Sequence, residues 1–220
     1  MTFSIVARSD DGGATYPTRA YAFDRSSTFA VSGGGTTHAC STADPTYDYR
    51  KMGADKSLVS PFRSNLYVTS RASLDANGDG VCDSVGMVYA RSTDHGGTWS
   101  SAQVLESDYF NVDQIAVAAD GAVLLAIRVL SSDSRCNLRP GIVLRRSTDG
   151  GATFNAGSCI FADATGEAQP NFVWPAAHPS DPSRLYLAFD GRVASLASQH
   201  IFFMTSTNGG NSWTAPLRID

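Results

Sequence analysis

The sequence has little of what a long exposed helix needs. Its 220 residues include only two lysines and two glutamates, Glu106 and Glu167, but 20 glycines and 9 prolines. Lysine and glutamate favour helices at exposed positions, whereas glycine and proline interrupt them. The composition therefore excludes a protein of long amphipathic helices and predicts an all-β fold of short strands joined by turns.

The sequence also lacks the features that are typical of nucleic-acid binding and of membrane insertion. The chain has 17 basic and 21 acidic residues, a formal net charge of −4, and no segment in which lysine and arginine are concentrated. A nucleic-acid partner is therefore not expected. The longest uninterrupted apolar run, residues 122–127, is far shorter than the roughly 20 residues that span a bilayer. We therefore expect no membrane span.

Four cysteines are spread along the chain without a Cys-x-x-Cys pair: Cys40, Cys82, Cys136 and Cys159. Zinc and redox motifs need closer spacing, so two disulfides are the preferred interpretation. Disulfides persist in oxidising compartments, which indicates a secreted or extracytoplasmic protein. Four buried free thiols remain the alternative at this point.

A short pattern, Ser-x-Asp/Asn-x-Gly-x-Thr/Ser-aromatic, occurs four times. Its copies are residues 9–16, 92–99, 147–154 and 206–213, and a strand-like run precedes each of them. The serine and the acidic or amide side chain can hydrogen-bond nearby backbone N–H groups, and the glycines supply positive φ angles. Each copy therefore predicts a tight hairpin whose final aromatic residue packs under a sheet.

This pattern resembles the Asp-box, or BNR repeat, of the sialidase-type β-propellers. Residues 65–69 and 184–188 resemble the second strand of such blades, and residues 179–182 resemble the turn before it. The resemblance covers nearly the whole chain. It implies an all-β fold, a β-propeller of four-stranded antiparallel blades with Asp-box hairpins.

Strand assignment by this scheme divides the chain into a half blade at 1–23 and three blades at 57–105, 114–161 and 171–219. The strands are expected at 3–8 and 20–23; at 57–60, 66–70, 86–91 and 102–105; at 114–118, 122–129, 141–146 and 158–161; and at 171–177, 184–189, 201–206 and 216–219. Sialidase-type propellers close with six blades. We therefore expect one propeller segment that forms an incomplete ring with the rest of the propeller, and a small closed ring of four blades is the alternative.

The blade scheme also favours one disulfide pairing among the three possible ones. Cys40 lies in the loop that enters the second blade, and Cys82 lies in the loop between the second and third strands of that blade. Cys136 and Cys159 both belong to the third blade. The expected bridges are therefore Cys40–Cys82 and Cys136–Cys159.

One loop carries a pattern typical of calcium sites. In residues 75–83, oxygen ligands stand at alternate positions, a glycine makes the sharp turn and an acid follows. The predicted ligands are Asp75, Asn77, Asp79, the backbone carbonyl of Val81, and Asp83. Gly86 stands where an EF-hand has its bidentate acid, so the set is incomplete. A solvated acidic turn is the alternative to a calcium site.

Catalytic residues are harder to place. The resemblance implies three arginines for a substrate carboxylate, a tyrosine nucleophile activated by a glutamate, and an aspartate acid/base, but the family's early Phe/Tyr-Arg-Ile-Pro segment is absent. The remaining candidates are Glu106, Tyr109, Arg128 and Glu167. Tyr47, Tyr49 and Arg50 are candidates for sugar contacts, because aromatic and charged side chains suit a sugar-binding rim. For each residue, a surface or structural role is the competing interpretation.

Three functions follow from these features. The first is a sialidase-like exo-glycosidase that hydrolyses terminal sugars, such as sialic acid, of glycans. The second is a non-catalytic Asp-box propeller that binds glycans or proteins outside the cell or at its surface, and the third is a structural repeat module. The repeat turns are expected to be structural, and binding is expected in the long polar loops at the other ends of the strands.

Overall fold

The computed structural model describes residues 4–23, 28–31, 36–40, 47–107, 114–166, 168–193 and 198–220. Among these residues every element is a β-strand except one 3-10 turn, η1 (Ser134–Cys136), so the expected all-β class is confirmed. No helix in the described part of the chain is long and apolar enough to cross a membrane. The chain divides into two compact units: unit 1 is Met1–Ala54 with Ser64–Val112, and unit 2 is Asp55–Arg63 with Asp113–Asp220.

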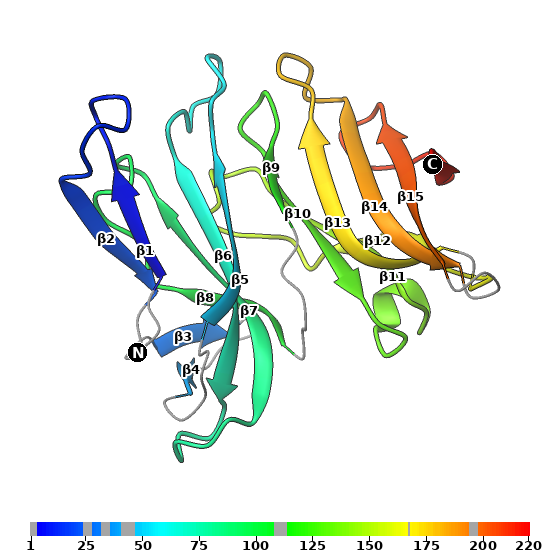
Figure 1. The fold of residues 1–220 in the computed structure, drawn as a ribbon, viewed down its shortest axis with the longest axis horizontal. Helices are drawn as coiled ribbons and strands as arrows, with labels where there is room; N and C mark the ends of the chain where they lie inside the picture. The colour runs from blue at the N-terminus through cyan, green and yellow to red at the C-terminus, as the bar shows by residue number, and fades with distance from the viewer. Residues whose placement is uncertain are drawn as a thin grey trace. The chain divides into compact units, whose positions relative to one another are not determined.

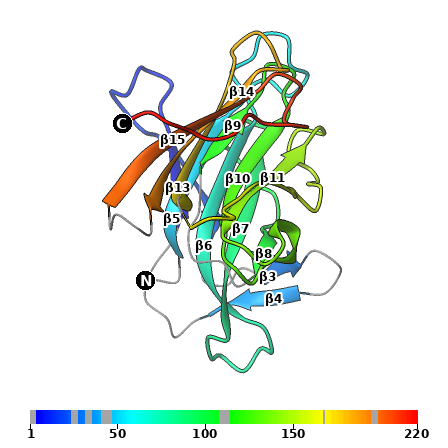
Figure 2. The ribbon, with the colours of Figure 1, turned by 90° about the vertical axis from the view of Figure 1, so that its right-hand side faces the viewer.

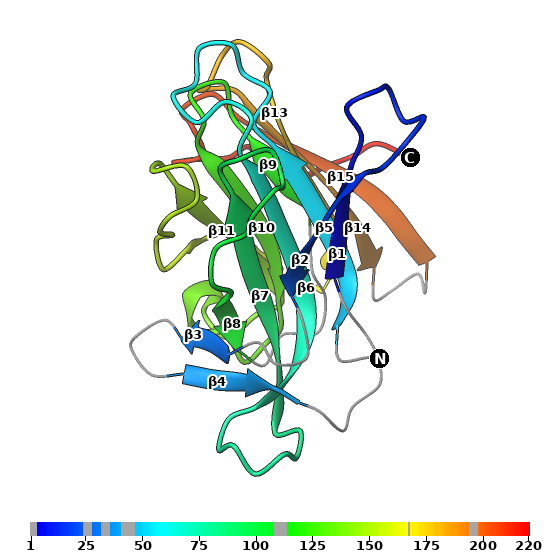
Figure 3. The same ribbon diagram turned by 90° about the vertical axis from the view of Figure 1, so that its left-hand side faces the viewer.

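Unit 1 contains a two-stranded and a six-stranded sheet (Figures 1 and 3). The first consists of β1 (Ser4–Arg8) and β2 (Thr18–Phe23). The second has an antiparallel series β5 (Tyr47–Ala54), β6 (Leu66–Asp75), β7 (Ser84–Ser92) and β8 (Gln103–Ser107). A hairpin of β3 (Thr28–Val31) and β4 (Thr36–Ala39) extends it, with β3 parallel to β8 and β4 paired with the end of β6.

Unit 2 contains two four-stranded antiparallel sheets, and Figure 2 shows them from the side of β13–β15. One is β9 (Ile115–Val117), β10 (Val123–Val129), β11 (Gly141–Ser147) and β12 (Ser158–Ala162). The other is β13 (Gln169–Ala177), β14 (Leu185–Val193), β15 (Ser198–Ser206) and β16 (Leu217–Arg218). In both sheets neighbouring strands follow one another in sequence, as expected for blades.

One predicted strand is wrong. Residues 57–60 form an irregular bend in unit 2, and the first strand of the long sheet in unit 1 is β5. The carboxylate of Asp55 accepts hydrogen bonds from the Ser57 amide (3.0 Å) and the Ser60 hydroxyl (2.5 Å), while the Ser57 hydroxyl donates to the carbonyl of Ala119 (2.5 Å). These side-chain bonds bend the backbone, which a strand does not allow. The β3–β4 hairpin was also not predicted.

Each unit has its own core, because its central strands, such as β6, β7, β10 and β11, are buried along most of their length, whereas β13 and β15 alternate between buried and more exposed side chains. In unit 1 the core includes Val68, Leu74 and Val88, with Phe23, Phe29 and other residues of β2–β8. In unit 2 it includes Leu124, Leu187 and Phe189 and lies among β9–β15. The repeat aromatics Trp99 and Trp213 pack against these two cores, respectively.

Both predicted disulfides are confirmed, and all four cysteines are paired. Cys40–Cys82 joins the residue after β4 to the β6–β7 loop, which projects beyond β4 in Figure 3. Cys136–Cys159 joins η1 to β12. The alternative of four free thiols is therefore wrong.

Candidate functional site

The four repeat turns share one set of hydrogen bonds. In the second copy, the Ser92 hydroxyl donates to Asp94 Oδ1 (2.8 Å) and accepts from the Gly96 amide (2.8 Å). The Thr98 amide and hydroxyl both donate to the Asp94 carboxylate, at 2.8 and 2.7 Å. The turns around Asp11 and Asp149 repeat these contacts.

The fourth turn reaches the same shape with a neutral side chain. Asn208 Oδ1 accepts from the Ser206 hydroxyl (3.0 Å) and the Ser212 amide (2.9 Å), as the aspartates do. Its Nδ2 group then donates to the Ser212 hydroxyl (2.8 Å), which reverses the direction of the last bond. Hydrogen bonding, and not charge, is therefore what the turn requires.

The carboxylates of these turns are engaged as acceptors. Hydrogen bonds from Thr15 and Ser9 hold the pKa of Asp11 well below its usual range, and bonds from Thr98 and Ser92 do the same for Asp94. Burial opposes ionisation of Asp149, but the bonds from Thr153 outweigh it and lower its pKa to about 2. A carboxylate with so low a pKa is a poor proton donor or base near neutral pH, so these turns act as structural elements.

At the strand ends away from the turns, the register places charged residues at matching positions. β6, β10 and β14 each pair with the strand that ends at a repeat serine, and a hydrophobic residue stands opposite that serine. The fifth residue after the hydrophobic one is Arg71 in β6, Arg128 in β10 and Asp190 in β14. The three full sheets thus present charged groups where binding was expected.

In unit 2, two of these charged residues belong to one hydrogen-bonded chain. Arg128 Nη1 donates to Asn171 Oδ1 (3.4 Å), and Asn171 Nδ2 donates to Asp190 Oδ2 (3.1 Å). The amide of Phe172 donates to Asp190 Oδ1 at 2.5 Å. Asp190 is only 9% exposed, so these bonds satisfy a carboxylate that is largely removed from water.

A β-bulge in β13 creates this arrangement. The pairing of β13 with β14 shifts between Pro170 and Val173, which leaves both Asn171 and Phe172 opposite Asp190. A bulge adds one residue to one strand and redirects the side chains beside it. Here it allows the side chain of Asn171 and the backbone of Phe172 to reach the same carboxylate.

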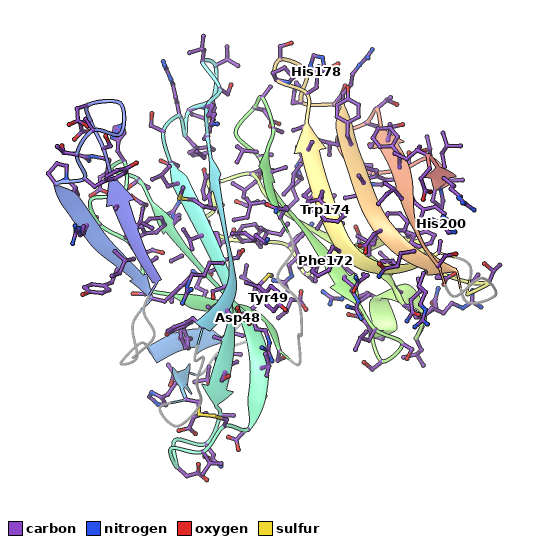
Figure 4. All side chains as sticks on the ribbon, viewed as in Figure 1. Asp48, Tyr49, Phe172, Trp174, His178 and His200 are labelled. Atoms are coloured by element: carbon purple, nitrogen blue, oxygen red, sulfur yellow. A yellow bond between two sulfur atoms is a disulfide. The ribbon has the colours of Figure 1, made fainter. Side chains whose placement is uncertain are left out.

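Two exposed aromatic rings belong to β13, beside the hydrogen-bonded series of Arg128, Asn171 and Asp190. Phe172 and Trp174 are 38% and 41% exposed, and their ring centroids are 6.1 Å apart (Figure 4). Trp174 lies opposite Ala188, two residues before Asp190, so Trp174 and Asp190 share one face of the sheet. We refer to Arg128, Asn171, Asp190, Phe172 and Trp174 as the unit 2 site.

In unit 1, the predicted sugar contacts are divided between core and surface. Tyr47 is buried, and its ring stacks on Phe23 at 5.6 Å, so it packs in the core. Tyr49 is exposed and adopts a φ of 49°, beside a bulge of β5 between Asp48 and Lys51. Arg50 is exposed, and its guanidinium donates to the carbonyl of Tyr47 (3.2 Å). Tyr49 and Arg50 therefore remain candidates for ligand contacts.

The structure describes two of the four predicted catalytic residues, and these two belong to different units. Glu106 is half-buried in β8, opposite Met87. Arg128 belongs to the unit 2 site. Tyr109 and Glu167 lie outside the described residues. Catalysis by these four residues stays a prediction.

The predicted calcium loop is held by its own hydrogen bonds. Asp75 accepts from the amides of Gly78 (2.6 Å) and Gly80 (2.8 Å), Asp79 accepts from Val81 (2.7 Å), and Asp83 accepts from Ala76 (2.9 Å). Asn77 Oδ1 accepts from the Asp79 amide (3.0 Å), and its Nδ2 donates to Asp79 Oδ2 (3.2 Å). In the described part of the chain, no three His, Cys, Asp or Glu side chains are grouped to hold a metal ion. Calcium binding here stays a prediction.

The sequence argument missed four residues of the unit 2 site: Asn171, Phe172, Trp174 and Asp190. A signal for Asp190 existed, because the Leu-Tyr pairs at 66–67 and 185–186 align the two strands and place Asp190 at the position of Arg71. No signal marked Asn171 and Phe172, since a bulge depends on the partner strand.

Comparison with known proteins supports the fold. No protein-family model matches the chain, and no curated protein matches its sequence. Among solved structures, it resembles a Trypanosoma rangeli sialidase mutant with trans-sialidase activity (TM-score 0.50, 15% identity, 90% of this chain and 34% of that one). It also resembles a PL25 ulvan lyase bound to a GlcA–Rha3S saccharide (0.51, 13%, 98% and 50%) and a levansucrase mutant from B. megaterium (0.50, 13%, 89% and 61%).

The chain spans about half the length of the solved structures it matches, and less than two thirds of each of these three. At such low identity the likeness concerns the fold alone. Together with the four-stranded antiparallel sheets, it shows that the fold of this chain is that of a β-propeller.

Proposed function

We propose that this chain is part of a sialidase-type β-propeller protein that acts on glycans, with its four repeat turns as Asp-boxes and the unit 2 site as a saccharide contact. The observation that carries the proposal is the Arg128–Asn171–Asp190 chain beside the exposed pair of Phe172 and Trp174. Sugar rings have apolar faces that pack on aromatic rings and hydroxyl groups that hydrogen-bond to amides and charged groups. The unit 2 site offers both kinds of contact.

The enzymatic form of this proposal is exo-hydrolysis of a terminal acidic sugar such as sialic acid. A guanidinium group such as that of Arg128 suits a sugar carboxylate, because the two planar groups can form paired hydrogen bonds. Retaining hydrolysis also needs a nucleophile and an acid on opposite sides of the sugar. Glu106, Tyr109 and Glu167 remain the candidates for these roles.

A non-catalytic glycan-binding propeller is the alternative, and one observation favours it. Both carboxylate oxygens of Asp190 accept hydrogen bonds, from the Phe172 amide and from Asn171. A carboxylate held in this way orients its neighbours well but is less available for proton transfer to a substrate. In this form the unit 2 site binds the saccharide without cleaving it.

The two disulfides support a secreted or extracytoplasmic location, because such bridges are rare in reducing compartments. Glycans and glycoproteins are abundant partners there. The proposed partner is therefore an extracellular or surface glycan.

The test combines binding and turnover. Purified protein is titrated with sialyllactose and lactose by calorimetry, and a fluorogenic sialoside is assayed in parallel. We expect sialyllactose to bind and Trp174→Ala to weaken binding about tenfold, the loss of one aromatic contact. Tyr16→Ala is the matched control, because Tyr16 is an exposed aromatic in a repeat turn.

The outcomes separate the alternatives. Turnover establishes the enzymatic form, whereas binding without turnover establishes the non-catalytic one. If neither sugar binds to folded protein, or if Tyr16→Ala weakens binding as much as Trp174→Ala does, the unit 2 site is not a saccharide site.

A further inference from the structure

A second group of polar side chains lies in β15 and just beyond β16, on residues that the proposed function does not use. Ser198 and His200 stand two residues apart in β15, so their side chains leave the same face of the sheet. The Ser198 hydroxyl lies 3.1 Å from His200 Nε2, and His200 Nδ1 lies 3.1 Å from Asp220 Oδ2. A hydroxyl, an imidazole and a carboxylate are thus linked in series (Figure 4 labels His200).

The carboxylate is fixed from several sides. Asp220 Oδ1 accepts from the Ile201 amide (3.1 Å) and from Arg218 Nε (3.3 Å), while Oδ2 faces the imidazole. Burial opposes ionisation of Asp220, but the hydrogen bonds from His200 and Ile201 outweigh it and lower its pKa. An ionised carboxylate can only accept, so in the neutral imidazole Nδ1 carries the proton toward Asp220 and Nε2 can accept from Ser198.

The surroundings hold the imidazole in place. His200 is 9% exposed and lies opposite Gly191 of β14. A Cβ at Gly191 would stand 2.9 Å from the ring of Phe202 and 3.2 Å from the backbone of Ala168, so only glycine fits beside the imidazole. Ser198, by contrast, is half-buried at the first position of β15 and retains access to solvent.

We propose that Ser198, His200 and Asp220 form a nucleophilic site that hydrolyses small carboxylic esters. A buried imidazole oriented by a carboxylate and bonded to a partly accessible hydroxyl is the arrangement that activates a serine. It lies on different residues from the unit 2 site, so it does not depend on the proposed glycan function.

The reaction proceeds in two balanced steps. The Ser198 oxygen forms a bond to the ester carbonyl carbon while its proton passes to His200 Nε2; the bond to the alcohol oxygen then breaks, and the departing alcohol takes that proton. Water next attacks the acyl group on Ser198, giving one proton to His200, which returns it to the serine oxygen as the carboxylic acid leaves. Asp220 stabilises the imidazolium in both steps and keeps its own charge.

The experiment uses a fluorophosphonate probe, which forms a covalent bond to activated serines, and p-nitrophenyl acetate as the ester. We expect stoichiometric labelling that peptide mapping assigns to Ser198, together with release of p-nitrophenol. Ser198→Ala should abolish both, and His200→Gln should slow labelling at least about 100-fold, the range of a general base. Asp220→Asn should also slow it, because the imidazole loses its orientation.

Ser183→Ala is the matched control. Ser183 is also half-buried and donates to a carboxylate, that of Asp181 (2.6 Å), without an imidazole between them. Circular dichroism checks that each variant is folded, and mapping of the wild-type label keeps the test decisive where a variant unfolds. Labelling of another residue, no labelling of folded wild type, or equal labelling of His200→Gln would overturn the proposal.

Discussion

The two ends of the strand pairs β6–β7, β10–β11 and β14–β15 are built in different ways. At one end stands a repeat turn with the same side-chain hydrogen bonds each time. At the other end the connections differ: Cys82 lies in the first, Cys136 in the second, and the third has neither. One end of each strand pair therefore repeats the same locally hydrogen-bonded turn. The connection at the other end varies in length and chemistry, as binding loops do.

The largest loss of stability should come from removing the disulfide that involves the β10–β11 connection. The double variant Cys136→Ser, Cys159→Ser loses a bridge between residues 23 apart, and we expect it to lower the free energy of unfolding by about 3 kcal/mol. Urea denaturation under non-reducing conditions measures this. An unchanged transition midpoint would show that η1 and β12 are held by packing alone.

A smaller loss is expected from breaking one repeat turn. Asp149→Ala removes the acceptor for the Thr153 amide and hydroxyl, and losing these charge-assisted hydrogen bonds should cost about 2 kcal/mol. Asp10→Ala is the control, since Asp10 is exposed and accepts from the side chain of Arg8, so its loss should cost under about 0.5 kcal/mol. Equal losses in the two variants would contradict the hydrogen-bond account.

Acid should weaken the aspartate turns before it affects the asparagine turn. The pKa of Asp149 is about 2 in the folded protein against 3.8 for a free side chain. The unfolded state therefore takes up the proton first, so the stabilisation is complete above about pH 5 and is lost as the pH falls toward 2. Asp149→Asn, which copies the residue of the fourth turn, should reduce this acid sensitivity in urea titrations at successive pH values.

The smallest change in stability is expected from calcium at the β6–β7 loop. If residues 75–83 bind the ion, calcium at ten times its dissociation constant should raise the free energy of unfolding by about 1.4 kcal/mol, and a chelator should reverse the gain. Asp79→Asn is expected to abolish this response, while magnesium should give little. A melting temperature that calcium leaves unchanged would identify the loop as a hydrogen-bonded acidic turn.

The sequence predicted the regular parts of the fold well. β7 and β11, which end at a repeat serine, lie within two residues of their expected bounds, and β15 ends at its expected residue but begins three residues earlier. The repeat turn marks the end of each strand locally, whereas no local pattern marks the start. The predicted first strand of the long sheet in unit 1, residues 57–60, is wrong, since Ser57 and Ser60 hydrogen-bond to Asp55 and the strand is β5 instead.

Much less of the candidate sites could be predicted. Arg128 was identified, but its partners Asn171 and Asp190 are 43 and 62 residues further along the chain. Tyr47 and Tyr49 stand two residues apart, a spacing that would place both on one face of a regular strand, yet Tyr47 is buried beside Phe23 and Tyr49 is exposed, because the bulge of β5 after Asp48 interrupts the alternation. Side chains that meet through strand pairing leave no local signal.

What the sequence determined by itself is therefore the turn chemistry, the all-β class, most strand positions and, through the blade scheme, the disulfide pairs. Each depends on residues close together in the chain or on a repeated spacing. What only the tertiary structure decided is the bulge that joins Asn171 and Phe172 to Asp190, and the series of Ser198, His200 and Asp220. Both arise from the register between paired strands, which is set by the packing of whole sheets and not by any short segment.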